Sequence, residues 1–309
     1  MDGKRRPSRR YEKSCAGISG GKTMKVAVIG VGGMGKWFAK LFKDAGDEVL
    51  VHDIKAKRMK MVAEELGVEF GEAEDIARKS ELVIVAVPIS AAPETIEKIA
   101  RVLGSRSLLV DICSVKEEIV DTMKELKTEA EMASIHPLFG PGASDLRGKD
   151  IIFVPVKVDR MYKKFKERIS EMGANVVEMK ADEHDKLMAV VQCLPHFSVL
   201  SFVLTLNSMK DFLVEDVKTP MFAHLLLASK AFLTRSPKLY GEIQVHNKYA
   251  SIVRERMLEV CRSLDVALSA GDAGVVEKEF MELKKLFSRK EMEKAYKLLY
   301  ELFERREER

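Results

Sequence analysis

The sequence MKVAVIGVGGMG at Met24–Gly35 decides the fold of the N-terminal half of this chain. Its consecutive apolar residues Val26–Ile29 are typical of a strand that is covered on both faces. The glycine pattern Gly30-x-Gly32-x-x-Gly35 comes next, and apolar residues at helical spacing then follow: Trp37, Phe38, Leu41 and Phe42. A strand that passes through three such glycines into a helix is how a βα turn that binds a dinucleotide begins.

Each glycine of this pattern has a physical role. Gly30 permits a tight turn, Gly32 lets the backbone approach a pyrophosphate, and Gly35 lets the helix pack on the strand. The unpaired N–H groups at the N-terminus of the helix attract negative phosphates. The predicted cofactor-binding residues here are Gly30, Val31, Gly32, Gly33, Met34 and Gly35.

Asp53 indicates which dinucleotide binds. It closes the strand-like run Val49–His52, where a carboxylate accepts both ribose hydroxyls of an adenosine and repels a 2′-phosphate. NAD is therefore the expected cofactor rather than NADP. Lys55, Lys57 and Arg58 follow closely and offer cations for such a phosphate, although charges in the first turn of a helix are more typical of a solvated face.

Length and composition indicate two folded domains. A chain of 309 residues with 46% hydrophobic residues is long enough for two cores. We expect a basic, disordered leader at 1–23, an α/β Rossmann-type dinucleotide-binding domain at 24–181, and an all-α dimerisation and substrate domain at 182–309. The leader carries seven basic against two acidic residues, which leaves −1 of the net charge of +4 for the rest of the chain. This distribution argues against a nucleic-acid partner.

The remaining composition predicts a cytoplasmic protein without a membrane partner. No apolar run approaches membrane-spanning length, and no signal-peptide pattern follows the basic N-terminus. The four cysteines form no CxxC pair, so neither a disulfide framework nor a metal site is expected. Two glutamines and three asparagines against 32% charged residues are typical of proteins from hot environments.

Strand and helix patterns alternate along the first half and predict a doubly wound parallel sheet. The expected strands are Glu81–Val87, Ser107–Ile112, Ala133–His136 and Lys149–Val154. The helices between them include Ala91–Val102 and Lys116–Lys127. Because ligands bind beyond the carboxyl ends of parallel strands, the residues that follow these strands are the candidates for chemistry.

Two of these strand ends carry candidate residues with alternative roles. Val87 and Pro88 close the first, where a proline either shapes the turn beneath the nicotinamide or simply ends the strand. Ser114 and Lys116 follow the second and place a hydroxyl and an ammonium at the crevice. Ser114 also fits the N-cap of the next helix, with Glu117 completing a capping box.

His136 is the strongest candidate for a catalytic role. It leads into the loop Pro137–Gly142, whose prolines and glycines fix the backbone. Histidine has the unperturbed pKa closest to neutrality, so it can take a proton from a substrate hydroxyl while hydride leaves the same carbon. A histidine at a strand end is often structural, and the stiff loop is what favours catalysis here.

Together these motifs resemble the prephenate dehydrogenase family, which acts on prephenate or arogenate. The resemblance rests on GVGGMG, on DICSVK at Asp111–Lys116, on HPLFGP at His136–Pro141, and on Asp182–His196, which is similar to the helix that opens the family's C-terminal domain. It implies that His136 accepts the hydrogen bond of the C4 hydroxyl of prephenate. It also implies that Ser114 assists this step, that His196 lines the substrate site, and that a homodimer forms through the helical domain.

The implied reaction is NAD-dependent oxidative decarboxylation of prephenate to 4-hydroxyphenylpyruvate in tyrosine biosynthesis. Hydride leaves the carbinol carbon for NAD⁺, and loss of carbon dioxide then makes the ring aromatic. The protein has to orient the substrate, accept one proton and hold two carboxylates. Cationic partners for these carboxylates are therefore required.

The sequence departs from the family pattern at the expected cation. The family usually places a substrate-binding arginine six residues before the proline of a Pro-x-Leu-Tyr segment, here Pro237–Tyr240, and Ala231 occupies that position. The adjacent Lys230 and the later Arg235 are therefore the candidate substrate-binding cations. A lysine offers a point charge instead of a planar fork, which affects affinity or substrate choice. Gly142 also stands where many relatives have an acidic residue.

From Asp182 onward the pattern is helical, and the expected helices are Leu187–Leu206, Ala223–Leu233, Leu239–Ser263 and Glu277–Phe287. A core or dimer-interface role is expected for the stripe of Met188, Val191, Leu194 and Val199. Structural or surface roles are expected for His184, His224 and His246. The charge run Glu301–Arg309 is expected to be solvated and frayed.

Three other functions stay open. Arogenate, the aminated analogue of prephenate, is a second candidate substrate, because the contacts that discriminate the two are those that depart from the pattern. A dehydrogenase of the 6-phosphogluconate or β-hydroxyacid type shares the two halves but leaves HPLFGP unexplained. A non-catalytic NAD-binding regulatory subunit predicts cofactor binding without turnover.

Overall fold

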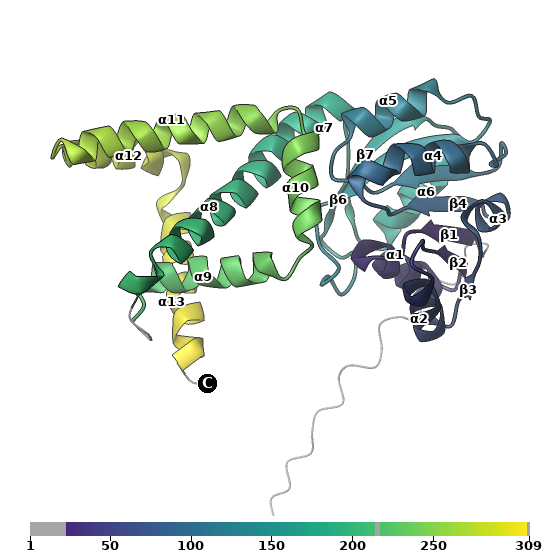
Figure 1. Ribbon diagram of the computed structural model, residues 1–309, viewed down its shortest axis with the longest axis horizontal. Coiled ribbons are helices and arrows are strands. Elements are labelled where there is room, and N and C mark those ends of the chain that lie inside the picture. The colour runs from purple at the N-terminus through teal and green to yellow at the C-terminus, as the bar shows by residue number, and fades with distance from the viewer. Residues whose placement is uncertain (1–22, 214–216, 308–309) are drawn as a thin grey trace, which may run out of the picture. The chain divides into compact units, whose positions relative to one another are not determined.

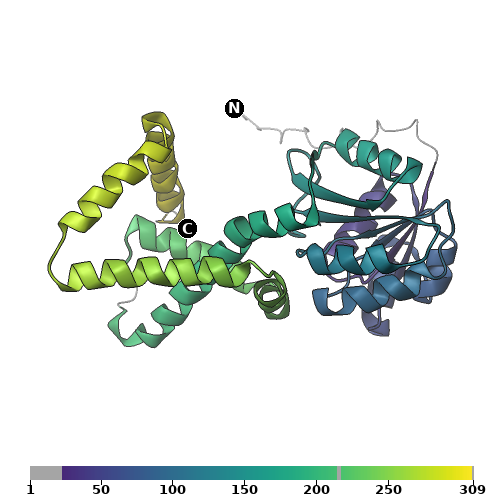
Figure 2. The same ribbon diagram turned by 90° about the horizontal axis from the view of Figure 1, so that it is seen from above.

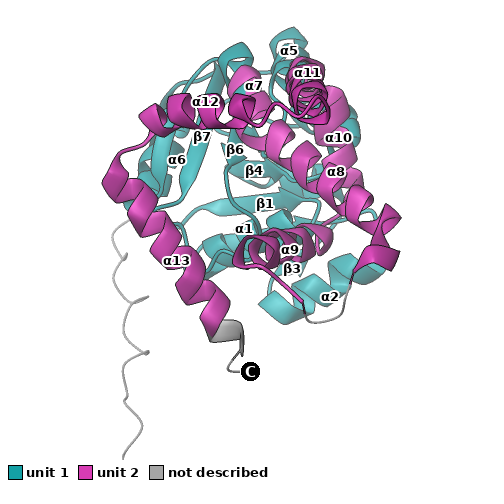
Figure 3. Ribbon diagram, turned by 90° about the vertical axis from the view of Figure 1, so that its left-hand side faces the viewer, with its two compact units in different colours: residues 1–184 teal, residues 185–309 magenta. Residues whose placement is uncertain are grey.

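The computed structural model describes residues 23–213 and 217–307 of the chain, with side chains described as far as residue 304. The chain divides into two compact units, unit 1 at residues 1–184 and unit 2 at residues 185–309, which have different colours in Figure 3. The disordered leader expected at 1–23 lies outside the described residues apart from Thr23, which is exposed.

Unit 1 is built on one sheet of eight strands in the order β3-β2-β1-β4-β5-β6-β7-β8. These strands are β1 Lys25–Ile29, β2 Glu48–His52, β3 Glu69–Phe70, β4 Leu82–Val85, β5 Leu108–Asp111, β6 Glu131–Pro137, β7 Asp150–Lys157 and β8 Asn175–Glu178. The strands from β3 through β6 pair in parallel, so their carboxyl ends share one edge of the sheet.

The helices of unit 1 are α1 Gly33–Asp44, α2 Ala56–Leu66, α3 Ala73–Arg78, η1 Ile89–Ala91, α4 Ala92–Ala100, α5 Glu117–Glu125, α6 Arg160–Glu171 and the start of α7 Ala181–Met188. They cover both faces of the sheet. Phe42 of α1 contacts Phe165 of α6 on one face, and α4 packs against α3 and α5 on the other. In Figure 2 the strands lie between α6 and the α4–α5 pair.

The predicted turn from strand through glycines to helix forms the centre of this unit. Val26, Ala27 and Val28 of β1 are completely buried between the two helix layers, as their unbroken apolar run predicts. On α1, Phe38 and Phe42 are completely buried and belong to the same core cluster as β1. Their four-residue spacing keeps both side chains on the sheet side of the helix.

The predicted doubly wound parallel sheet is confirmed for most strand pairs, but not at β7. This strand runs antiparallel to β6, with Ser134 opposite Val154 and His136 opposite Ile152. A parallel pair requires a crossover of a dozen or more residues, usually with a helix. The connection at 138–149 contains turns but no helix, so the chain returns directly beside β6.

Unit 2 is helical in its described residues. Its elements are the end of α7, the π-helix η2 Ala189–Cys193, α8 Leu194–Ser208, η3 Lys210–Phe212, α9 Pro220–Leu233, α10 Pro237–His246, α11 Ala250–Ser269, α12 Gly274–Leu283, η4 Lys284–Leu286 and α13 Arg289–Glu307. Helix α9 packs against α8 and α13, and α11 packs against α8, η2 and α12. Figure 1 labels α8 through α13, whose ribbons run from teal-green to yellow.

One helix prediction and the prediction for the C-terminal tail are wrong in unit 2. The single helix expected at Leu239–Ser263 is divided into α10 and α11, because Asn247 leaves the helical conformation. Its side chain donates to the carbonyl of Asp185 (2.8 Å) and accepts from the backbone N–H of Tyr249 (2.9 Å), which ends one helix and starts a turn. The tail expected to fray from Glu301 is instead helical as far as Glu307, and residues 308–309 lie outside the described residues.

The expectation that no apolar run approaches membrane-spanning length is also wrong. Residues Ala181–Ser208, the continuous run of α7, η2 and α8, are long and apolar enough to cross a membrane by length and composition. All charged residues of this run lie before Leu187, and the rest is uncharged. Only 17% of its most apolar window is buried inside the described structure, so this helix exposes apolar side chains.

Candidate active site

The predicted site residues of unit 1 follow neighbouring strands at one edge of the sheet. Asp53 follows β2, the glycine loop follows β1, Val87 and Pro88 follow β4, and Ser114 follows β5. His136 lies at the end of β6, next in the sheet. The parallel pairing from β2 through β6 therefore brings these residues, distant in sequence, to the same edge.

The glycine loop leaves room for a phosphate group. Gly30 has a φ of 91°, and a Cβ there would lie 2.7 Å from the carbonyl oxygen of Ala86. A Cβ on Gly35 would lie only 1.9 Å from the carbonyl oxygen of Gly30, so the helix start packs directly on the turn. A Cβ on Gly32 would meet no atom within 4 Å, and no side chain caps the N-terminus of α1. The open N–H groups at this terminus fit the pyrophosphate of a dinucleotide.

Asp53 does not lie open to a ligand. Its carboxylate accepts the backbone N–H groups of Val31 (2.9 Å) and Lys55 (2.8 Å). Arg58 adds a two-pronged contact, with Nε at 2.9 Å from Oδ2 and a terminal nitrogen at 2.8 Å from Oδ1. Arg58 is thus half-buried with its guanidinium on this carboxylate, whereas Lys55 and Lys57 are exposed, as expected of a solvated face.

His136 is buried and contacts a second histidine that the sequence patterns did not single out. Its Nδ1 lies 2.9 Å from Nε2 of His184 on α7, and both rings are buried. Burial holds the pKa of His136 well below its ordinary value of 6.5, and the nearby charges of His184 and Lys116 lower it further. The ring is therefore neutral at physiological pH and able to accept a proton. His184, expected to be structural or at the surface, lies in the site.

Lys116 is buried beneath this edge instead of lying open in the crevice. Its ammonium is 3.1 Å from Oδ1 of Asp111 and 2.6 Å from the hydroxyl of Ser134. None of the Lys116 or Asp111 side chain is exposed to solvent. Lys116 and Asp111 thus form a fixed internal ion pair near His136, and neither meets a ligand directly.

Ser114 is half-buried in the loop between β5 and α5. It is not the N-cap of α5, because the helix begins at Glu117 with Lys116 at the N-cap position and no side-chain cap. The predicted capping box is therefore wrong. Ser114 keeps its position at the strand end next to that of His136.

The loop after His136 packs on the helix that follows the glycines. Trp37 of α1 donates its indole N–H to the carbonyl of Ala143 (2.7 Å), and its ring lies 5.0 Å from that of Phe139. A Cβ on Gly33 would lie 3.0 Å from Pro141. The stiff loop predicted from its prolines and glycines is thus fastened to the start of α1.

The residues predicted from the second half lie in unit 2. His196 of α8 forms an aromatic cluster with Tyr240 (4.5 Å between ring centroids) and Phe232 (5.7 Å). Burial lowers the pKa of His196, and its Nδ1 is buried without a hydrogen-bond partner among the described residues. Lys230 and Arg235 are exposed and flank Phe232 in the chain.

Arg235 is the cation that acts on this cluster. Burial raises the pKa of the Tyr240 hydroxyl, and the positive charge of Arg235 opposes that rise. Its backbone N–H also bonds to the carbonyl of Phe232 (3.2 Å), which fixes the turn between α9 and α10.

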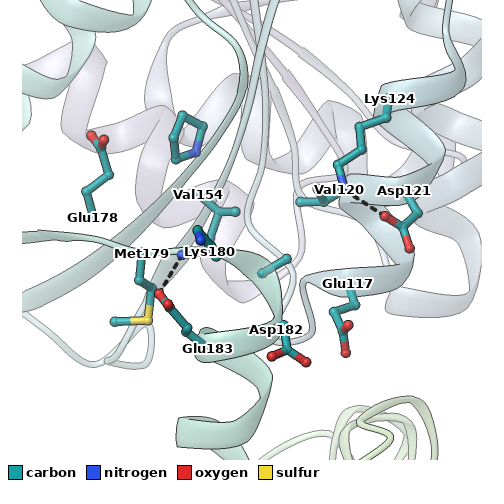
Figure 4. A pocket seen from close by; sticks show the side chains of 12 residues that line it. Glu117, Val120, Asp121, Lys124, Val154, Glu178, Met179, Lys180, Asp182 and Glu183 are labelled. Carbon is teal, nitrogen blue, oxygen red and sulfur yellow. Dashed lines mark hydrogen bonds and ion pairs between the residues drawn. The ribbon is translucent and has the colours of Figure 1, made fainter.

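A separate pocket of unit 1 contains none of the predicted site residues. It has a volume of about 560 Å³ and lies between α5, β7 and the start of α7 (Figure 4). Its charged lining is mostly acidic, and several of these groups are already paired: Lys124 with Asp121, the backbone N–H of Lys180 with Glu183, and Glu178 with Tyr162 and Lys166. An acidic lining of this kind does not suit a substrate with two carboxylates.

Comparison with known families assigns both halves of the chain. The sequence profile of the prephenate dehydrogenase nucleotide-binding domain matches residues 38–178. The profile of the prephenate dehydrogenase dimerization domain matches residues 180–289. These two matches cover strands β2 through β8 of unit 1 and most of the helices of unit 2, whereas β1 and the glycine loop precede the first match.

Individual relatives agree with these profiles. A probable arogenate/prephenate dehydrogenase of Methanocaldococcus jannaschii is 30% identical over 281 residues, which are 88% of this chain and 63% of that protein. This chain thus spans less than two thirds of that relative's length. A 4-amino-4-deoxyprephenate dehydrogenase of Streptomyces pristinaespiralis is 28% identical and is matched over 84% of this chain and 89% of its own.

Solved structures share the fold. The structure of prephenate dehydrogenase from Aquifex aeolicus in complex with hydroxyphenyl propionate and NAD⁺ superposes with a TM-score of 0.70 at 20% identity, over 86% of this chain and 98% of that one. The predicted order of a Rossmann-type domain followed by a helical domain is confirmed. This chain belongs to the prephenate dehydrogenase family.

Proposed function

We propose that this chain catalyses the NAD⁺-dependent oxidative decarboxylation of prephenate to 4-hydroxyphenylpyruvate. The observation that carries the proposal is the buried His136, with Nδ1 in contact with His184, at the strand edge that also holds the glycine loop. NAD⁺, when bound, supplies the hydride acceptor. The glycine loop fits its pyrophosphate, and Val87 and Pro88 follow β4, which pairs with β1 directly before that loop.

His136 is the proposed base for the C4 hydroxyl. For its Nε2 to accept a proton, Nδ1 has to carry the other proton and donate it in a hydrogen bond to Nε2 of His184. His184 is therefore a positioning residue in this scheme, since it selects the useful tautomer of His136. Ser114, at the neighbouring strand end, is the proposed hydrogen-bond partner of the same hydroxyl.

The atoms of this reaction balance without another reactant. As hydride leaves C4, the hydroxyl proton moves to His136 and the C–O bond becomes a carbonyl. The bond to the ring carboxylate then breaks, carbon dioxide leaves, and its electron pair makes the ring aromatic. The proton returns from His136 to the phenolate oxygen, so the histidine ends the cycle neutral.

Unit 2 supplies the proposed substrate-binding residues. The two carboxylates of prephenate require cations, and Arg235 is favoured because its charge acts on the cluster that contains His196. Lys230 is the second candidate. Arogenate remains a second candidate substrate, because the Methanocaldococcus jannaschii relative is named for both compounds.

The test is formation of reduced nicotinamide by the purified full chain with prephenate and with arogenate. His136→Asn should lower turnover by on the order of a hundredfold or more, while the dissociation constant of NAD⁺ stays unchanged. His224→Asn, the same exchange at a histidine with no assigned role, is the matched control. Undiminished turnover in His136→Asn would exclude the assigned base, and turnover with arogenate alone would change the substrate.

We also propose that the chain is a cytoplasmic homodimer that assembles through unit 2. The match to a dimerization domain supports this proposal, as does the exposed apolar surface of α8, where Leu200 and Leu204 are 40% and 60% exposed. Burial of that surface against a second copy accounts for a long apolar helix without a membrane.

A further inference from the structure

The carboxylate of Asp53 has no acceptor capacity left for a ligand. An ionised carboxylate offers about four lone-pair positions. Here two are taken by the backbone N–H groups of Val31 and Lys55, and two by the nitrogens of Arg58. A ribose hydroxyl that approaches this position cannot donate to Asp53 without displacing one of these partners.

The group that faces outward is the cation. The Arg58 side chain is 38% exposed, whereas that of Asp53 is only 1% exposed. In this fold the 2′-oxygen of the adenine ribose binds at the carboxylate after β2, so a dinucleotide bound at the glycine loop would meet the guanidinium that covers this carboxylate. Arginine has five N–H donors, so donors remain after the two that bind Asp53.

The surrounding charges favour an anion at the same place. Arg58 neutralises Asp53, which is the residue that would repel a 2′-phosphate. Lys55 and Lys57 are exposed on either side of the start of α2, and the first turn of that helix contains no acidic residue. The surface that Lys55, Lys57 and Arg58 form over the buried Asp53 carboxylate is therefore positively charged.

We propose that Arg58 sets the cofactor preference and that the site takes NADP⁺ as well as NAD⁺. The guanidinium forms a charge-assisted pair with the 2′-phosphate of NADP⁺ and accommodates the bare hydroxyl of NAD⁺. This inference rests on the proposed function in one respect: a dinucleotide has to bind at the glycine loop. It departs from the expectation of NAD alone, which assumed an accessible Asp53.

The experiment measures the dissociation constants of NAD⁺ and NADP⁺ by isothermal titration calorimetry on the full chain at one fixed salt concentration. For the unaltered protein the two constants should lie within about tenfold of each other, because the repulsive carboxylate is neutralised. Arg58→Ala should raise the constant for NADP⁺ by about tenfold or more and change that for NAD⁺ by less than about threefold. The dissociation constant of NADP⁺ for Arg58→Lys should lie between those of the unaltered protein and Arg58→Ala. Lysine keeps the positive charge but lacks the planar guanidinium.

Lys60→Ala is the matched control, since it removes an exposed positive charge from the same helix and should leave the ratio of the two constants unchanged. NAD⁺ binding more than about a hundredfold tighter than NADP⁺ in the unaltered protein overturns the inference. So does an Arg58→Ala variant that weakens both dinucleotides equally. Since no turnover is measured, an inactive protein that still binds both dinucleotides refutes only the proposed reaction, whereas binding of neither refutes the dinucleotide site itself.

Discussion

The hydrogen bond between His136 and His184 determines which nitrogen of His136 is left for the substrate. Replacing His184 with phenylalanine keeps a buried ring but removes the acceptor for Nδ1, so both tautomers of His136 become populated. We expect His184→Phe to lower kcat by roughly tenfold to a hundredfold with little change in KM. His184→Gln, which keeps an acceptor, should recover part of that loss.

The pH profile is a second readout of the same pair. Burial, then His184 and then Lys116 lower the pKa of His136, and a base acts only when it is deprotonated. Activity should therefore be lost only as the pH falls through the lowered pKa, so the acid limb of kcat/KM lies below pH 6.5. An acid limb at or above that value, or an unchanged profile and kcat in His184→Phe, contradicts this role.

Residues with local signals were predictable, and those whose partners are distant in sequence were not. The glycines and His136 could be identified because the residues that determine a turn or a stiff loop are adjacent in the sequence. His184 lies 48 positions from His136, and only the path of the chain after β8 brings the two rings together. The pairing of Arg58 with Asp53 was not predictable, because the sequence does not show that this carboxylate is buried beneath the start of the helix.

At the scale of elements, the close approach of α1 to the turn after β1 gives a stability prediction. A Cβ on Gly35 would overlap the carbonyl oxygen of Gly30 at 1.9 Å, and backbone cannot move aside as a flexible side chain can. Gly35→Ala should lower the free energy of unfolding by about 1–3 kcal/mol or more. It should also abolish dinucleotide binding.

Denaturant unfolding and calorimetry check this expectation. Gly104→Ala is the control, because a Cβ there meets no atom within 4 Å and the φ of Gly104 is not positive. A Gly35→Ala protein as stable as the Gly104→Ala protein, with dinucleotide binding intact, contradicts the proposed packing.

Element types were predictable from apolar spacing, but strand direction and helix interruptions were not. The pattern of β7 is that of a buried strand in either direction, and only the helix-free connection at 138–149 makes it antiparallel.

The helix interruption lies near Pro195 of α8, which has no N–H to donate. The π-helix Ala189–Cys193 directly precedes α8. Val191 of this π-helix is exposed, whereas Met188, the last residue of α7, is buried.

For the whole molecule, the exposed helices of unit 2 predict the state of assembly. The purified chain should sediment at twice the chain mass, because surfaces of this apolar character associate in water. Leu204→Glu on α8 should shift the equilibrium toward the monomer, since a carboxylate is costly in a dry interface.

Met61→Glu is the matched control for that experiment. Met61 is 55% exposed on α2 of unit 1, compared with 60% for Leu204, and lies outside the dimerization-domain match. Sedimentation velocity without detergent distinguishes the outcomes. A monomer at all concentrations, or recovery of the chain only in the membrane fraction, contradicts a dimer through unit 2.

Trp37 lies where its fluorescence can report on the candidate active site. It is the only tryptophan in the chain, and it contacts the loop after His136 through Phe139 and Ala143 while standing one turn into α1. Indole emission depends on its hydrogen bond and on nearby absorbers, and reduced nicotinamide absorbs in the same near-ultraviolet band. Intrinsic fluorescence can therefore follow the arrival of a cofactor and any movement of the histidine loop in real time, without a label.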